Sequence, residues 1–92
     1  MPVYALPAAL TLDTASAVRR QALAALQAQP APWVVDTSAL QAFDSAALAF
    51  LLELRRAAPG QALEVNAVPA RLRDLANAYG LAFLFGATDA PL

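Results

Sequence analysis

Two apolar runs joined by a polar loop dominate the middle of the chain. Residues 33–35 (Trp-Val-Val) form a run that is too short for a helix and rich in β-branched and aromatic side chains, so it predicts a buried strand ending at Asp36. Residues 46–54 form a longer run rich in alanine and leucine, which predicts a helix. Asp44 and Ser45 stand just before this run, where a side-chain oxygen can accept a hydrogen bond from a free N–H of the first helical turn. The pattern therefore predicts a strand, a loop and a helix in succession.

The residues before this unit predict a hairpin and a helix. The apolar runs 3–6 and 8–12 are separated by Pro7, which cannot donate a hydrogen bond within a sheet, so we expect two antiparallel strands with the proline near the turn. The polar residues 13–14 offer a cap for a helix over residues 15–28. Apolar positions three and four apart define its expected buried face, which consists of Ala15, Val18, Ala22 and Leu26.

The alternation continues after the central helix. Residues 62–66 predict a short strand. Pro69 suits the first position of a third helix, because the N–H that it lacks would be unpaired there in any case, and Gly80 is expected to end that helix. Residues 81–85 are either a last edge strand or an apolar loop packed on the core, and residues 86–92 are a tail. The expected buried stripe of the third helix consists of Leu72, Leu75, Ala76 and Tyr79.

This alternation of strands and helices predicts an α/β fold. We expect a mixed sheet of four or five strands with about three helices packed on it. Parallel pairing through right-handed crossovers accounts for most of the sheet, and the N-terminal hairpin would contribute one antiparallel strand. A chain of 92 residues, 60% of them hydrophobic, has the size and the apolar content of one domain, so residues 1–92 are interpreted as a single domain.

Composition excludes several function classes. The formal net charge of −1 gives no basic footprint for nucleic acid. The sequence has no cysteine and no histidine, which removes disulfides, thiol chemistry and the commonest general base and metal ligand. It also has no glycine-rich phosphate loop, so we expect no catalytic residue, cofactor or metal site. Residues 46–52, the charge-free apolar stretch of the predicted central helix, are far fewer than the roughly 20 that cross a bilayer, and the N-terminus lacks the basic start of a signal peptide. We therefore expect a soluble, cytoplasmic protein without direct membrane insertion.

Two aspartates flank the loop between the central strand and helix. Asp36 and Asp44 have no general-base partner in the pattern, so we interpret them as ligands of backbone N–H groups. Asp36 would cap the turn after the strand, and Asp44 would bind N–H groups beside Ser45. We interpret Thr37 and Ser38 as ordinary turn residues unless a partner reaches their hydroxyls.

The central helix carries more apolar surface than one sheet covers. At ~100° per residue its apolar side chains span about 200°, whereas a one-sided helix needs only somewhat over ~100°. Its best inward-facing set consists of Ala47, Leu48, Leu51 and Leu54. The residues that then align on the flank are Ser45, Ala49, Leu52 and Arg56, which we call the Ser45 stripe. Either neighbouring helices cover Leu52 or the Ser45 stripe binds a protein partner, and we favour partner binding.

The same stretch resembles the STAS domain family (sulfate transporter and anti-sigma factor antagonist). The family signature is a strand ending in aspartate, a short loop, and Asp-Ser or Asp-Thr with small residues at the start of a helix. Residues 34–36 (Val-Val-Asp) and 43–48 (Phe-Asp-Ser-Ala-Ala-Leu) match it, with Ala47 where the family usually has glycine. Residues 68–72 and 78–81 further resemble the MlaB group, the small STAS subunits of the bacterial phospholipid ABC transporter that maintains outer-membrane lipid asymmetry. The resemblance covers nearly the whole chain and implies the same α/β architecture.

The resemblance implies a binding protein rather than an enzyme. It implies a subunit that binds and supports the transporter ATPase, an MlaF-like protein in a complex with the permease, at the cytoplasmic face of the inner membrane. Spacing alone makes Ser45 a helix cap. The resemblance instead places Ser45 in the contact with the ATPase, and we expect Asp44 and the rest of the Ser45 stripe there as well. The alternative is an anti-sigma factor antagonist, in which a partner kinase phosphorylates the residue matching Ser45 and so switches binding.

Overall fold

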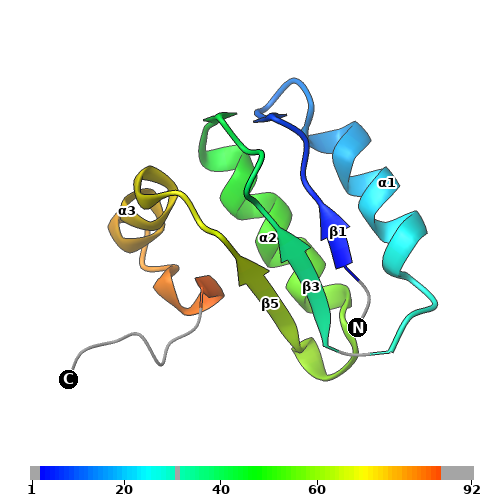
Figure 1. Ribbon diagram of the computed structural model, residues 1–92. Helices are drawn as coiled ribbons and strands as arrows, with labels where there is room; N and C mark the ends of the chain where they lie inside the picture. The colour runs from blue at the N-terminus through cyan, green and yellow to red at the C-terminus, as the bar shows by residue number, and fades with distance from the viewer. Residues whose placement is uncertain (1–2, 31, 86–92) are drawn as a thin grey trace.

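The computed structural model describes residues 3–30 and 32–85, which form three α-helices and five short strands (Figure 1). Strands and helices alternate along most of this length, as the hydrophobic pattern predicts, and two short 3₁₀ segments complete the structure. In chain order the elements are β1 (Val3–Ala5), β2 (Ala9–Leu10), α1 (Ala15–Leu26), β3 (Trp33–Asp36), β4 (Ala42–Phe43), α2 (Ser45–Ala57), η1 (Pro59–Gln61), β5 (Leu63–Asn66), α3 (Ala70–Ala78) and η2 (Ala82–Phe85).

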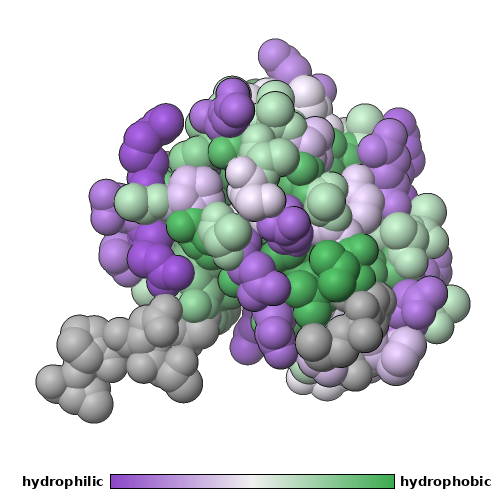
Figure 2. Space-filling model, viewed as in Figure 1, coloured by the Kyte–Doolittle hydropathy of each residue, from purple (hydrophilic) through white to green (hydrophobic). Residues whose placement is uncertain are grey.

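The main sheet is parallel and has the strand order β1-β3-β5, while β2 and β4 form a separate parallel pair. One face of the sheet rests on α2, with α1 on the side of β1 and α3 on the side of β5 (Figure 1). Side chains alternate across the sheet, so Tyr4, Val35 and Val65 pack on the core. Val3 and Glu64 belong to the opposite face and are exposed. Seen from that face, hydrophobic and polar surface are interspersed (Figure 2).

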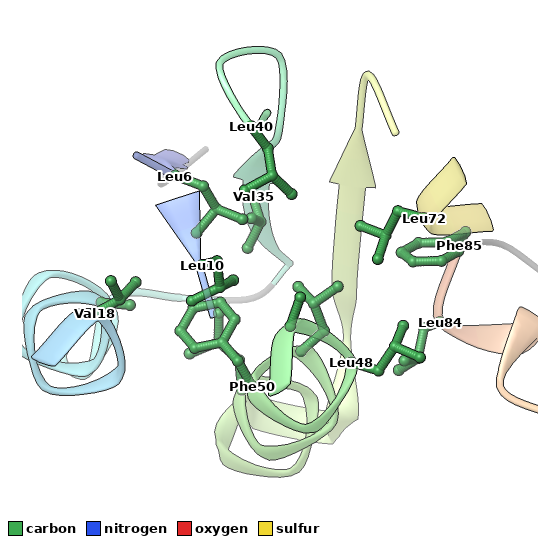
Figure 3. Close-up of a cluster of buried hydrophobic side chains, with 14 of the residues drawn as sticks. Leu6, Leu10, Val18, Val35, Leu40, Leu48, Phe50, Leu72, Leu84 and Phe85 are labelled. Carbon is green, nitrogen blue, oxygen red and sulfur yellow. The ribbon is translucent and has the colours of Figure 1, made fainter. Parts of the chain in front are cut away.

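The hydrophobic core lies between the sheet and the helices, and α2 is its largest contributor. Leu10 and Val18 reach it from the N-terminal part of the chain, and Leu72, Leu84 and Phe85 reach it from the C-terminal part (Figure 3). Full burial of one such side chain stabilises the fold by roughly 1.5–3 kcal/mol relative to exposure. The buried residues of α2 are Ala47, Leu48, Phe50, Leu51 and Leu54.

The predicted N-terminal hairpin is wrong, because its two strands do not pair with each other. β1 pairs with β3 and β2 pairs with β4, in both cases in parallel. The Leu6 N–H extends the β1 pairing by donating to the Asp36 carbonyl at 2.9 Å, and the Ala8 carbonyl then accepts from the N–H groups of residues 41–42. Pro7 therefore interrupts one extended segment without reversing it, because a missing N–H breaks a ladder but does not by itself turn the chain.

The predicted helix starts are confirmed to within one residue. α2 begins at Ser45 and α1 at Ala15, while α3 begins at Ala70, so that Pro69 occupies the capping position instead of the first helical one. Ala15 is half-buried on the predicted inner face of α1. The fully buried residues of that face are Val18, Ala22 and Leu26.

The C-terminal end of α3 departs from the prediction. Tyr79, expected in the core, is 59% exposed. Gly80 has a φ of +73°, which reverses the chain, and the Leu81 N–H then donates to the Ala76 carbonyl at 2.8 Å. This glycine-terminated ending turns the residue after the glycine inward, so the partly buried Leu81 packs on the core and Tyr79 stays outside. The rest of the predicted stripe is at least partly buried, namely Leu72, Leu75 and Ala76.

The segment after α3 forms the 3₁₀ helix η2 and is not an edge strand. Leu84 and Phe85 are buried against the core, as expected of the apolar alternative. The predicted tail at residues 86–92 lies outside the described residues. Across residues 3–30 and 32–85, no helix has both the length and the apolar character needed to cross a membrane.

Candidate functional site

Asp44 organises the start of α2. Its backbone is extended, and its Oδ1 accepts a hydrogen bond from the Ala46 N–H at 2.8 Å, which caps the helix. Its Oδ2 accepts a second bond, at 3.1 Å, from the N–H of Leu12 in the turn before α1. The predicted role of Asp44 as a backbone ligand is confirmed, and the second bond fixes the turn around Leu12 beside Ser45.

Asp36 caps the turn after β3, as predicted. The Ser38 N–H donates to its Oδ1 at 2.9 Å. This backbone bond, together with a bond from the Ser38 hydroxyl, lowers the pKa of the Asp36 carboxyl from its usual value. Since the folded pKa is the lower one, the bonds stabilise the fold above the unfolded pKa, and the contribution is lost as the pH falls through the folded value.

The interpretation of Thr37 as an ordinary turn residue is wrong. Thr37 is fully buried, and its hydroxyl lies 2.7 Å from the Asn66 carbonyl and 2.9 Å from the Ala67 carbonyl. Its N–H also donates to the Asn66 carbonyl. Thr37 therefore ties the end of β3 to the end of β5. Nothing in the local pattern marks this threonine, because its partners lie 29 and 30 residues away.

The Ser45 stripe lies on the outward face of α2. Ser45, Ala49 and Arg56 are exposed and Leu52 is half-buried. The opposite, predicted inward set is confirmed in full, and Phe50 joins it on the side of α1 (Figure 3). Ser45, Ala49 and Arg56 thus share one accessible ridge, while Leu52 also packs against the edge of the core, and the role of the four residues in partner binding remains a prediction.

Two open hollows flank the start of this ridge, and Asp44 and Ser45 line both of them. One lies between α1 and α2, and the other between α2 and α3. Each has a volume of about 540 Å³. Ser45 therefore stands on a crest between two concave surfaces, an arrangement that helical periodicity alone does not reveal.

The hollow between α2 and α3 brings together residue types that dominate the binding energy of protein interfaces. The Arg71 guanidinium lies over the Phe43 ring, 5.0 Å from its centroid, and the exposed Tyr79 forms part of the same wall. Tyrosine and arginine are enriched among interface hot spots. The sequence signal for Tyr79 was its position directly before Gly80, which places it at the helix end rather than in the buried stripe.

The hollow between α1 and α2, which we call the α1–α2 groove, is walled mainly by small and apolar side chains. Leu12, 79% exposed, stands at its edge. Arg19 Nε and Glu53 Oε1, 3.3 Å apart, form an ion pair between the two helices that border it. The other residues that line this groove beside Asp44 and Ser45 are Ala15, Ser16, Ala46, Ala49 and Phe50.

The sequence contains no histidine or cysteine. In the part of the chain that the structure describes, no three Asp or Glu side chains come together as a metal-binding group. The carboxylates of Asp36 and Asp44 are engaged with backbone N–H groups, as a structural role requires.

Comparison with known proteins agrees with the fold and the motif. The family model described as the MlaB-type STAS domain matches residues 2–85 of the 92. No curated protein matches the chain. STAS domain proteins are typically non-catalytic. Since the matched segment includes the strand, the Asp44-Ser45 helix start and all three helices, the chain belongs to the STAS domain family, with MlaB as the group that it resembles.

Proposed function

We propose that this chain is a non-enzymatic STAS subunit that binds and supports the ATPase of an ABC transporter for phospholipid, working at the cytoplasmic face of the inner membrane. The observation that carries the proposal is the accessible Ser45 stripe on a domain matched by an MlaB-type model. Such a transporter would serve the lipid asymmetry of the outer membrane. The ATPase, in a complex with its permease, would be the direct partner.

The surface around Ser45 supports a protein partner. Leu12 and Tyr79 are among the most exposed large apolar side chains of the described residues, and they edge the two hollows on either side of Ser45. Apolar and aromatic anchors surrounded by polar residues are the usual composition of an interface centre. Arg56, at the far end of the Ser45 stripe, is exposed and would act as a rim charge.

Support of the ATPase follows from mass action. A subunit that binds only the folded or assembled form of its partner stabilises that form by an amount set by its concentration relative to the dissociation constant. No step of ATP hydrolysis is assigned to this chain, so the purified protein is expected to show no ATPase activity. Turnover that co-purifies through several columns and disappears with a point mutation in this chain would contradict this expectation.

An anti-sigma factor antagonist is the second candidate, and the exposed Ser45 hydroxyl is the observation that favours it. A phosphoryl group there would add about −1.5 to −2 charges and three acceptor oxygens. It would stand beside the Asp44 carboxylate and between both hollows, where it would disrupt a packed contact.

Titration of the purified chain against two partners separates the candidates. One partner is the ATPase of the phospholipid ABC transporter from the same organism, and the other is an anti-sigma factor kinase. The proposal predicts a saturable complex with the ATPase and no phosphate transfer to Ser45. Binding to the kinase alone, with phosphorylation of Ser45 seen by mass spectrometry, would contradict it and establish the second candidate.

A further inference from the structure

The α1–α2 groove has a shape that can accommodate one projecting side chain of a partner and the backbone that carries it. Its walls carry alanine and serine side chains from both helices, and Phe50 lies at its base. Small side chains let a second backbone approach closely. Leu12 stands at the edge, held there by the bond from its N–H to Asp44 Oδ2. An aliphatic side chain entering the groove would pack against Leu12 and would remove the exposed apolar surface of Leu12 from water.

The charge around the groove is negative near Ser45. Asp44 lines the groove, and Asp13 follows the exposed Leu12 in the same turn. Among residues 3–30 and 32–85, neither carboxylate has a basic side chain as an ion-pair partner. Arg19, the basic residue that lines the groove, is already paired with Glu53. This rim repels nucleic acid and anionic lipid and attracts a cation.

We infer that the α1–α2 groove receives a helix of the protein partner that presents an aliphatic side chain with a lysine or arginine one turn away. The aliphatic group fills the groove against Leu12, and the basic group reaches the carboxylates of Asp13 and Asp44. This inference rests on the proposed function for the identity of the partner and adds the chemistry of the segment that docks. It also extends the contact from the Ser45 stripe to the α1 side of the crest.

Filling the groove with a bulky side chain tests whether an aliphatic side chain of the partner binds there. Ser16 is exposed on α1 and lines the groove, so Ser16→Trp should weaken binding to the transporter ATPase at least about tenfold. Ala17→Trp adds the same bulk one residue along α1, outside the groove lining, and should bind like the parent. Thermal melting of both variants should match the parent, because both positions are exposed.

Reversing a charge at the rim of the groove tests whether a basic side chain of the partner binds there. Asp13→Lys should slow association by about tenfold at low salt, and the difference should shrink as salt rises. Glu64→Lys makes the same change of charge on β5, on the outer face of the sheet, and should leave the association rate close to that of the parent.

A photo-crosslinking residue in place of Leu12 identifies the docked segment within the complex with the ATPase. A crosslink to a helix carrying an aliphatic residue and a lysine or arginine within four positions supports the inference. A crosslink to an acidic segment, or none in the assembled complex, overturns it.

The outcomes also separate this inference from the proposed function. One outcome is that the parent binds the ATPase, Leu52→Glu abolishes binding, and Ser16→Trp and Asp13→Lys bind like the parent. In that case the proposed function stands, and the α1–α2 groove is not the binding site of the partner helix. If the parent does not bind the ATPase at all, both are overturned.

Discussion

Asp44 joins two parts of the chain that lie 32 residues apart in sequence. One carboxylate oxygen caps α2 and the other holds the turn around Leu12. A single side chain therefore sets both the start of the Ser45 stripe and the edge of the α1–α2 groove. The cap could be predicted from the sequence, because it acts within two residues, whereas the long-range bond could not.

Replacing Asp44 by alanine should lower the free energy of unfolding by about 1–2 kcal/mol, because both hydrogen bonds are lost. Asp44→Asn keeps a capping acceptor and should lose less. Urea denaturation of the two variants beside the parent measures the difference. An alanine variant as stable as the parent would show that neither bond contributes.

Thr37→Val should destabilise the protein by roughly 1–3 kcal/mol, because it removes a buried hydroxyl and leaves backbone carbonyls of residues 66–67 without that donor. Thr37→Ser keeps the hydroxyl and serves as the matched control. Both are compared by chemical denaturation. Equal stability of the valine variant and the parent would show that the Thr37 hydroxyl does not stabilise the connection between β3 and β5.

At the scale of elements, α2 has two faces with different tasks. Its inner face fills the centre of the core, and its outer face carries the Ser45 stripe. Leu51 is fully buried and Leu52, the next residue, is half-buried on the flank. Substitutions at these two adjacent leucines can therefore be compared directly, Leu51 for its effect on folding and Leu52 for its effect on binding.

Leu51→Ala should cost roughly 2–5 kcal/mol of unfolding free energy, since it leaves a cavity in the core. Leu52→Ala should cost less, because water already reaches part of that side chain. Denaturant midpoints of the two variants provide the test. A loss below ~1 kcal/mol for Leu51→Ala would contradict its place in the core.

At the scale of the whole molecule, the α/β class, the three helices and the central strand could be predicted from hydrophobic periodicity and capping residues. The family resemblance rested on the stretch around Asp36, Asp44 and Ser45 and on residues 68–72 and 78–81. These features are local, because a helix start or a buried strand depends on residues within a few positions of one another.

The strand pairing and the hollows beside Ser45 depend on residues far apart in the chain, whereas the position of Tyr79 was predicted wrongly for a local reason. The apolar pattern on either side of Pro7 is compatible with two arrangements, a hairpin or two strands that pair with residues 33–43. The structure has the second arrangement. Tyr79 fits the period of α3, but the turn at Gly80 places Leu81 inward instead. The hollows beside Ser45 arise from the packing of three helices, which no single segment encodes.

The central claim is that the Ser45 stripe is the binding surface. It is tested by measuring affinity for the transporter ATPase together with thermal melting for three variants, Leu52→Glu, Ser45→Glu and Arg56→Glu. Leu52→Glu should abolish or strongly weaken binding, because it puts an uncompensated charge into a packed contact, and should disturb melting much less. Ser45→Glu should weaken binding while leaving α2 intact, because a negative charge suits a helix N-terminus. Arg56→Glu should mainly slow association at low salt. Parental affinity and melting in all three variants would contradict the claim, and unfolding of Leu52→Glu would assign Leu52 to the core.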